Sequence, residues 1–391
     1  MVATFPTGSA PALRRIAIVG HSAAVLADRF GGLIDRLQSQ GHKVMCLAPD
    51  LTAQHASEHF EQWQQRGVAV AAFPYASGQR MWSDFSTNRA LLAHMRAWKP
   101  HAAIAMGHRL GPMGVDAAAR AGAGRTLIAV SGIAGERAHH LNLAPLRKAQ
   151  MAGHGALCSS VSDLRVLMHN RAEAAGAASV SATPIHVAPA GIDLDAVPSA
   201  QLPPIGNGFV FAMAAPMQSD QGIEAYCGAA RIVRARSPQT RFLLAAVGRT
   251  PPSARLRETI ASAGDSVEDT GYCADVSAFL AAAHVAVSVP EHDGLLAPGV
   301  TALALGRPLI VSNAPDVCDL VDESVNGHRV DAGDEQALAE AMLAILRRKD
   351  LVPAMGRASR AKAVRNYDQR ELLPQLLAAL GIAPIAAGKA A

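Results

Sequence analysis

Short apolar runs alternate with longer amphipathic segments along the first half of the chain. Strands are predicted at 14–20, 42–49, 68–75, 101–107, 126–132 and 156–160, and helices at 25–41, 89–98 and 113–122. Short apolar strands that alternate with helices are typical of a parallel sheet that helices bury on both faces. The pattern therefore predicts an α/β fold for this half.

The pattern is interrupted at 184–205 and then resumes. That stretch is rich in proline and glycine and lacks a long hydrophobic period, which predicts a linker. Beyond it, strands are predicted at 208–215, 241–248, 285–289 and 308–313, and helices at 221–235 and 335–349. We therefore expect two parallel-sheet domains, 1–195 and 196–368. A C-terminal helix and tail, 369–391, contain the helix at 370–381, which could pack against either domain or cross back to the first.

Composition limits the class of protein. A chain of 391 residues is too long for one ordinary core, which agrees with two domains. Lys and Arg (36) exceed Asp and Glu (32) only slightly, so the charge gives no case for nucleic-acid binding. The first 15 residues lack the apolar core of a signal peptide, and no apolar run is long enough to span a bilayer. We expect a cytoplasmic protein that at most sits peripherally on the inner face of the membrane.

The five cysteines show no paired spacing. They are scattered along both halves, mostly in apolar or alternating stretches, as Cys46, Cys158, Cys227, Cys273 and Cys318. This usage favours buried free thiols in a reducing compartment over a metal site. We therefore expect no metal at these cysteines. No cofactor is expected either.

Two loops that follow predicted strands carry candidate functional residues. Glu291, His292 and Asp293 follow the strand 285–289, and Gly20-His21 follow the strand 14–20. Ligands of α/β proteins bind at the carboxyl ends of the strands, which favours a binding role for both loops. Asp-Gly is also a common turn pair, and a lone histidine is often a surface or satisfied group. The residues alone leave both interpretations open.

Longer motifs point to a family. The second half contains "DGLLAPGVTALALGRPLIVSN" and "VDESVNGHRVDAGDEQALAEAM", and the first contains "GHSAAVLADRFGGLIDRLQSQGHKVMCLAPD". Gly306-Arg307-Pro308 and Asn326-Gly327 fix the register of the comparison. In these motifs the chain resembles retaining GT-B glycosyltransferases of the family-four type, from the branch that builds bacterial surface polysaccharides and lipid-linked glycans. The resemblance implies two Rossmann-like domains that face each other across a cleft, and a nucleotide-sugar donor, UDP-sugar above all.

The resemblance also assigns roles in the donor site. Asp293 matches the acid that stabilises the sugar in the transition state, and Thr301 matches the acid that binds the ribose. A neutral threonine gives up the ionic assistance that roughly doubles the strength of such a hydrogen bond. Pro216 and Gln221 stand where the family has an arginine and a lysine for the donor diphosphate. The expected site is catalytic at Asp293 and His21, and the expected donor-binding residues are Gly20, Glu291, Gly294, Thr301, Gln221, Arg249 and Arg307.

Other groups are expected to replace the two missing cations. Arg307, Arg249 and Arg109 are candidates, together with helix N-terminal amides near Gly222 or Ala297, because such amides bind phosphate without side-chain charge. The acceptor or phosphate candidates are His108, Arg109, Arg80 and Trp82. Arg80 and Trp82 fall in 76–92, which matches a variable acceptor loop and suits a lipid interface, although an ordinary hydrophobic anchor fits the same residues.

Three classes of function follow. The first is transfer of a sugar from a UDP-sugar to a lipid-linked or polysaccharide acceptor with retention. The second is a catalytically silent relative that acts as a partner subunit for another glycosyltransferase or as a glycan-binding protein. Four altered donor-site residues favour it, namely Thr301, Pro216, Gln221 and Asp293, whose side chain is one methylene shorter than that of the family's acid. The third, a nucleotide-sugar epimerase of GT-B shape, is disfavoured because the required acids and histidine spacing are not evident.

Overall fold

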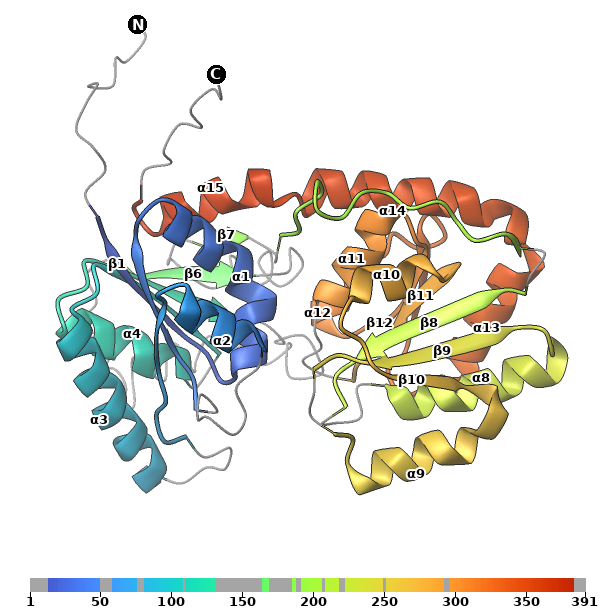
Figure 1. Ribbon diagram of the computed structural model, residues 1–391, viewed down its shortest axis with the longest axis horizontal. Coiled ribbons are helices and arrows are strands. Elements are labelled where there is room, and N and C mark those ends of the chain that lie inside the picture. The colour runs from blue at the N-terminus through green and yellow to red at the C-terminus, as the bar shows by residue number, and fades with distance from the viewer. Residues whose placement is uncertain are drawn as a thin grey trace, which may run out of the picture.

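The computed structural model describes residues 13–49, 58–75, 81–107, 110–130, 164–168, 185–187, 191–205, 208–217, 222–248, 251–291 and 296–382. These residues form two parallel sheets, each with helices packed on its faces (Figure 1). The α/β fold predicted from the alternating pattern is confirmed. All the strand pairs within both sheets are parallel.

The first sheet has the strand order β3-β2-β1-β4-β5-β6-β7. Its strands are β1 (Arg15–Val19), β2 (Lys43–Leu47), β3 (Ala69–Ala71), β4 (Ala102–Met106), β5 (Arg125–Val130), β6 (Leu164–Met168) and β7 (Ile185–Val187). The helices around it are α1 (Ala23–Ser39), α2 (Glu58–Gln65), α3 (Met81–Trp98) and α4 (Leu110–Arg120). The central strand β4 is buried along its whole length, as its uninterrupted apolar sequence predicts.

The second sheet has the order β10-β9-β8-β11-β12-β13. Its strands are β8 (Val210–Ala215), β9 (Arg241–Ala246), β10 (Glu268–Tyr272), β11 (Val285–Ser288), β12 (Leu309–Ser312) and β13 (Gly327–Val330). Its helices are α8 (Ile223–Arg236), α9 (Ala254–Ala263), α10 (Val276–Ala281), α11 (Ala297–Leu305), α12 (Pro315–Cys318) and α13 (Glu335–Arg347). Two helices follow, α14 (Val352–Asn366) and α15 (Gln369–Ala379).

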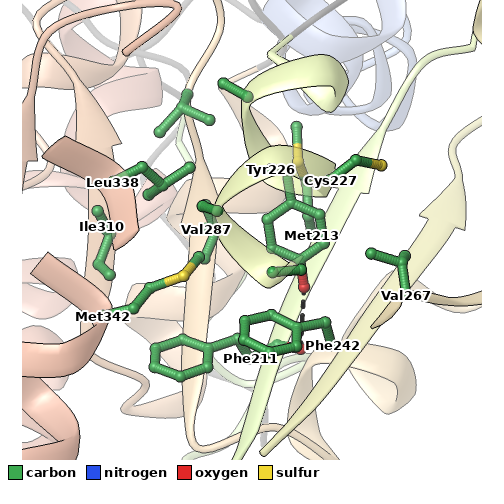
Figure 2. Close-up of a cluster of buried hydrophobic side chains, with 14 of the residues drawn as sticks. Phe211, Met213, Tyr226, Cys227, Phe242, Val267, Val287, Ile310, Leu338 and Met342 are labelled. Atoms are coloured by element: carbon green, nitrogen blue, oxygen red, sulfur yellow. Dashed lines mark hydrogen bonds between the residues drawn. The ribbon is translucent and has the colours of Figure 1, made fainter. Parts of the chain in front are cut away.

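An apolar cluster fills one face of the second sheet (Figure 2). Phe211 and Phe242 stack with their ring centroids 5.5 Å apart, and Tyr226 of α8 packs edge-on to Phe242. The Tyr226 hydroxyl lies 3.1 Å from the carbonyl oxygen of Phe211 and 3.0 Å from that of Leu243. Burial raises the pKa of Tyr226 well above its ordinary value, so this hydroxyl stays a hydrogen-bond donor.

The chain crosses between the two domains twice, and backbone hydrogen bonds join the two crossing segments. Ile192 donates to the carbonyl of Tyr367 at 2.7 Å, and Gln369 donates to the carbonyl of Ile192 at 3.1 Å. Gly191 lies so close to Gln369 that a Cβ there would be 2.9 Å from its Cα. Beyond this crossing α15 returns to the first sheet, where Leu376, Leu377 and Leu380 join its apolar core.

Several local expectations are corrected. The stretch 184–205 is not linker throughout, because β7 occupies 185–187 and adds a strand to the first sheet. The expected acceptor loop 76–92 is helical from Met81 onward, in α3. The strands β6, β7, β10 and β13 have no counterpart among the predicted strands, and the predicted strand 156–160 lies outside the described residues.

Candidate functional site

Each sheet has a point where the strand order reverses. In the first sheet it lies between β1 and β4, and in the second between β8 and β11. Ligands of open parallel sheets bind outside the carboxyl ends of the strands at such a switch point. The loops concerned begin at Gly20 after β1, Gly107 after β4, Pro216 after β8 and Val289 after β11. These four loops define the candidate site.

The turn between β1 and α1 is short and tightly packed. The Gly20 amide donates to the carbonyl of Leu47 at 2.9 Å, and a Cβ on Gly20 would approach Leu26 of α1 to 2.7 Å. Ser22 caps α1, because its hydroxyl accepts a 3.2 Å hydrogen bond from the Val25 amide. His21 lies exposed between these two anchors. Its position at the first switch point is the one that the sequence predicts for it.

A pocket of about 200 Å³ opens at the carboxyl ends of β8, β9 and β10. It is lined by Met217, Ala246, Gly248, Pro251, Pro252, Ile260, Asp269, Gly271 and Tyr272. Asp269 shapes the rim, because its Oδ1 accepts a 2.9 Å hydrogen bond from the amide of Gly271, whose φ is +71°. Ordinary small-molecule pockets start at roughly 300 Å³, so this one suits a single flat fragment of a larger ligand.

At the second switch point α8 begins directly against the end of β11. Gly222 has a φ of +85°, and a Cβ there would overlap the carbonyl oxygen of Val289. Only glycine permits both this backbone conformation and this approach. No side chain caps the start of α8, and Gly222 is its N-cap residue. The helix N-terminus that the sequence proposed near Gly222 therefore lies at this switch point.

The start of α11 is occupied by an acid from the other domain. The Asp28 carboxylate, on α1, accepts hydrogen bonds from the amides of Ala297 (3.0 Å) and Leu296 (3.4 Å). Burial raises the pKa of Asp28, while the charge of Arg29 and these two hydrogen bonds oppose the rise. The amides near Ala297, which the sequence proposed as phosphate ligands, are thus bound by the protein itself.

Thr301 lies on α11, one turn after Ala297. Its residue is only 8 % exposed, and nearly every residue of this helix is buried. Its hydroxyl therefore has little access to solvent in this arrangement of the domains. The ribose-binding role that the sequence gives to Thr301 stays a prediction.

Arg307 has a structural role, which corrects its expected place among the donor-binding residues. The side chain is completely buried, and its two terminal nitrogens donate to the carbonyls of Ala200, Gln201, Ala281 and Leu305 at 2.7–3.1 Å. Burial lowers the pKa of Arg307 to about 10, so the group remains charged at neutral pH. A cation that is engaged and enclosed in this way is not exposed to a donor phosphate.

Most of the other predicted site residues lie outside the described residues. They are Asp293, Gly294, Gln221, Arg249, His108, Arg109 and Arg80. Trp82 lies in the first turn of α3. Glu291 follows β11 and is exposed, and its Oε1 would lie 3.3 Å from a Cβ placed on Gly333. Two residues of the site were not predicted, because Asp28 lies within an ordinary amphipathic helix and Tyr272 lies in a polar stretch.

The described cysteines are free thiols. Cys46 and Cys227 are buried, and Cys273 and Cys318 are half-buried. Burial raises the pKa of Cys46 to about 12, which leaves its thiol protonated and unreactive at neutral pH. Among the described residues no three or more His, Cys, Asp or Glu side chains are grouped as metal ligands would be, and no helix has the length and hydropathy needed to cross a membrane.

Comparison with known proteins finds similarity to a glycosyltransferase family and to one curated relative. Residues 208–348 match the family model described as glycosyl transferases group 1. A phosphatidyl-myo-inositol mannosyltransferase of Mycobacterium leprae is 36% identical over 78 residues, which are 20% of this chain. That match spans about a fifth (21%) of the length of the mannosyltransferase.

Solved structures identify the fold of the whole chain. The Anabaena protein HepE, solved in complex with UDP and glucose, aligns with a TM-score of 0.70 and 16% identity over 94% of this chain and 99% of its own. Sucrose-phosphate synthase of Thermosynechococcus elongatus aligns with a TM-score of 0.67 and 17% identity over 93% and 97%. The chain has the GT-B fold of these proteins, as the sequence predicts.

Proposed function

We propose that the protein is a retaining glycosyltransferase that takes its sugar from a UDP-sugar. The observation that carries this proposal is the match of residues 208–348 to the glycosyl transferases group 1 model, because this segment builds the pocket at the ends of β8, β9 and β10. HepE, which shares the fold, was solved with UDP, with UDP and glucose, and with UDP-glucose. In this proposal the pocket takes the nucleobase, with the Tyr272 ring against its face.

The reaction requires charge stabilisation at two places. As the glycosidic bond to the donor phosphate breaks, the sugar ring gains positive charge and the leaving diphosphate gains negative charge. Asp293 would face the sugar and Thr301 the ribose, and Gly20 and His21 would close the site from the first domain. No metal or other cofactor takes part in this proposal.

Neutralising the diphosphate is the difficult step for this chain. Removing one preorganised donor from such a site costs about 3 kcal/mol of transition-state stabilisation. Pro216 stands at the end of β8 where a cation is expected, and Gln221 replaces the second. Backbone amides near Gly222, at the start of α8, and the side chains of Arg249 and Arg109 are the proposed substitutes.

The acceptor is proposed to be a lipid-linked glycan or a growing polysaccharide of a bacterial surface. Its binding would fall to the first domain, at His108 and Arg109 after β4 and at Arg80 and Trp82 near the start of α3. A membrane-bound acceptor would bring the protein to the inner face of the cell membrane as a peripheral cytoplasmic protein.

A second candidate function is a catalytically silent GT-B protein that serves as a partner subunit for another glycosyltransferase or as a glycan-binding protein. Two observations favour it, namely Pro216 in place of a cation and the Asp28 carboxylate on the first amides of α11. Negative charge at that helix start opposes the approach of a diphosphate.

Isothermal titration with UDP, GDP and their sugar conjugates tests the donor site. Saturable binding of UDP in the micromolar to millimolar range is expected, and no binding at millimolar nucleotide would reject the transferase and favour the silent protein. Asp293→Asn should then abolish sugar transfer or donor hydrolysis while nucleotide affinity stays nearly unchanged. Asp265→Asn, at an exposed acid of the same domain, is the matched control and should retain full turnover.

A further inference from the structure

The contact between α1 and α11 joins the two domains through one carboxylate. Asp28 lies 268 and 269 positions before the two residues whose amides it accepts from, and its side chain is only 4% exposed. Figure 1 shows α1 on the side of the first domain that faces α11 and α12 of the second. This carboxylate therefore makes a dry polar contact across the domain boundary.

The Asp28 carboxylate caps the start of α11, which has no side-chain cap of its own. The first amides of a helix have no partner within the helix and are usually capped by the side chain of the N-cap residue. Within this chain α1, α9, α10, α13 and α15 are capped in this way by Ser22, Ser253, Asp275, Asp334 and Asp368. The N-cap residue of α11 is Leu296, which makes no side-chain cap, and the acid of the other domain takes its place.

Arg29 holds the carboxylate in position. Its Nε lies 3.1 Å from Oδ2 of Asp28, and its side chain is 3% exposed. Both charges belong to α1, and neither partner of the ion pair lies on α11. Separation of the domains would thus hydrate an intact ion pair on one side and two helix amides on the other, and no isolated charge would be left buried.

The described part of the boundary contains no shared apolar core. Among the described residues, two clusters of buried apolar side chains belong to the first sheet and its helices, including α15, and two belong to the second sheet. Domains that do not share a large apolar interface are expected to move relative to each other. A few polar contacts then decide which arrangement is populated.

We infer that Asp28 is an interdomain latch. By capping α11 across the boundary, it holds the second domain in the arrangement seen here, with the loops after β1 and β11 brought to the same boundary. When the latch opens, the amides of Leu296 and Ala297 become accessible to water. The inference concerns the domain arrangement and holds whether or not the protein transfers sugar.

Two measurements on the full chain test the latch. Spin labels at Glu61→Cys on α2 and Glu258→Cys on α9, both exposed positions, report the distance between the domains after Cys158, Cys273 and Cys318 are replaced by serine. Hydrogen exchange of the peptide that contains Leu296 and Ala297 reports the state of the cap. Asp35→Ala is the control, because Asp35 lies on the same helix in an exposed ion pair with Arg66 of the same domain.

Asp28→Ala should broaden and shift the distance distribution and speed exchange at the α11 start about fivefold, as expected for a lost cap. Asp28→Ala combined with Arg29→Gln avoids an uncompensated buried charge and should show the same two changes if the single variant folds poorly. Asp35→Ala should match the unmodified protein in both measurements. Unchanged distances and unchanged exchange in a folded Asp28 variant would overturn the latch. Absence of UDP binding would count against the proposed donor site alone.

Discussion

The guanidinium group of Arg307 donates a 2.8 Å hydrogen bond to the carbonyl oxygen of Gln201, 106 positions earlier in the chain. With three further carbonyls bound, this side chain ties the segment that enters the second domain to α10 and to the turn after α11. Arg307→Met should lower the free energy of unfolding by about 3 kcal/mol or more, because several buried carbonyls lose their donor. Urea unfolding measures this loss.

Arg347→Met is the matched control for this substitution. Arg347 is an exposed residue in the last turn of α13, so its replacement should change stability by no more than about 0.5 kcal/mol. Equal effects of the two substitutions would contradict the structural role of Arg307.

Gly222→Ala tests the close approach of α8 to the end of β11. The added Cβ would overlap the backbone of Val289 and would also require a positive φ, so a loss of at least about 1 kcal/mol in stability is expected. Gly122→Ala has the same positive φ but nothing within 4 Å of the added atom. Thermal unfolding should therefore rank Gly222→Ala as clearly the more damaging of the two, and the reverse order would refute the steric argument.

His284 should make stability depend on pH. Its Nδ1 accepts from the Val210 amide at 3.0 Å and its Nε2 lies 3.1 Å from the Pro203 carbonyl oxygen, an arrangement that needs the neutral ring. Burial lowers the pKa of His284, and the positive charges of Arg307 and Lys349 lower it further, against the opposing hydrogen bond to Pro203. The unfolded chain is therefore protonated at this residue from about pH 6.5 downward, before the folded chain is.

The contribution of His284 to stability is present above about pH 6.5 and is lost as the pH falls below it, by at most about 1.4 kcal/mol per pH unit. His284→Gln keeps an acceptor and a donor but cannot titrate, so urea unfolding at pH 7.5 and 5.5 should differ less in the variant. The dependence should not vanish, because burial also lowers the pKa of His42. An unchanged pH difference in the variant would rule out His284 as the source.

Tyr272→Ala tests the pocket as a nucleobase site. Tyr272 is 41% exposed at the pocket rim, and loss of base stacking on an aromatic ring costs about 1–3 kcal/mol, so UDP affinity should fall about fivefold or more. Phe85→Ala removes an even more exposed ring, 69% exposed, from α3 of the first domain and should leave the affinity unchanged. Titration calorimetry that finds equal affinities for Tyr272→Ala and the unmodified protein would place the base elsewhere.

The hydrophobic pattern was sufficient for the elements that are buried on both faces. The strand predicted at 101–107 is β4 and the helix predicted at 25–41 is α1, because an apolar run or an apolar stripe is the direct signature of such burial. β10 was not predicted, because all five of its residues are exposed and its sequence "EDTGY" shows no alternation of apolar and polar residues. β7 was not predicted, because its three residues lie inside a proline- and glycine-rich stretch.

The candidate site was less predictable because its contacts join distant parts of the chain. Position alone placed Gly20 and His21 correctly at the end of the central strand β1. Arg307 was expected to be an exposed cation, and the carbonyls that enclose it come mainly from segments 26 to 107 positions away. The contact of Asp28 with α11 spans 269 positions, and no local pattern within α1 distinguishes this acid from any other on the helix.

The return of α15 to the first domain has a consequence for synthesis of the protein. Leu376, Leu377, Ala379, Leu380 and Ile382 complete an apolar core whose other buried members come from the first 129 residues. While the second domain is being synthesised, these C-terminal residues are still missing, and the apolar core of the first domain is incomplete. The final packing of the first domain therefore follows the synthesis of the second domain.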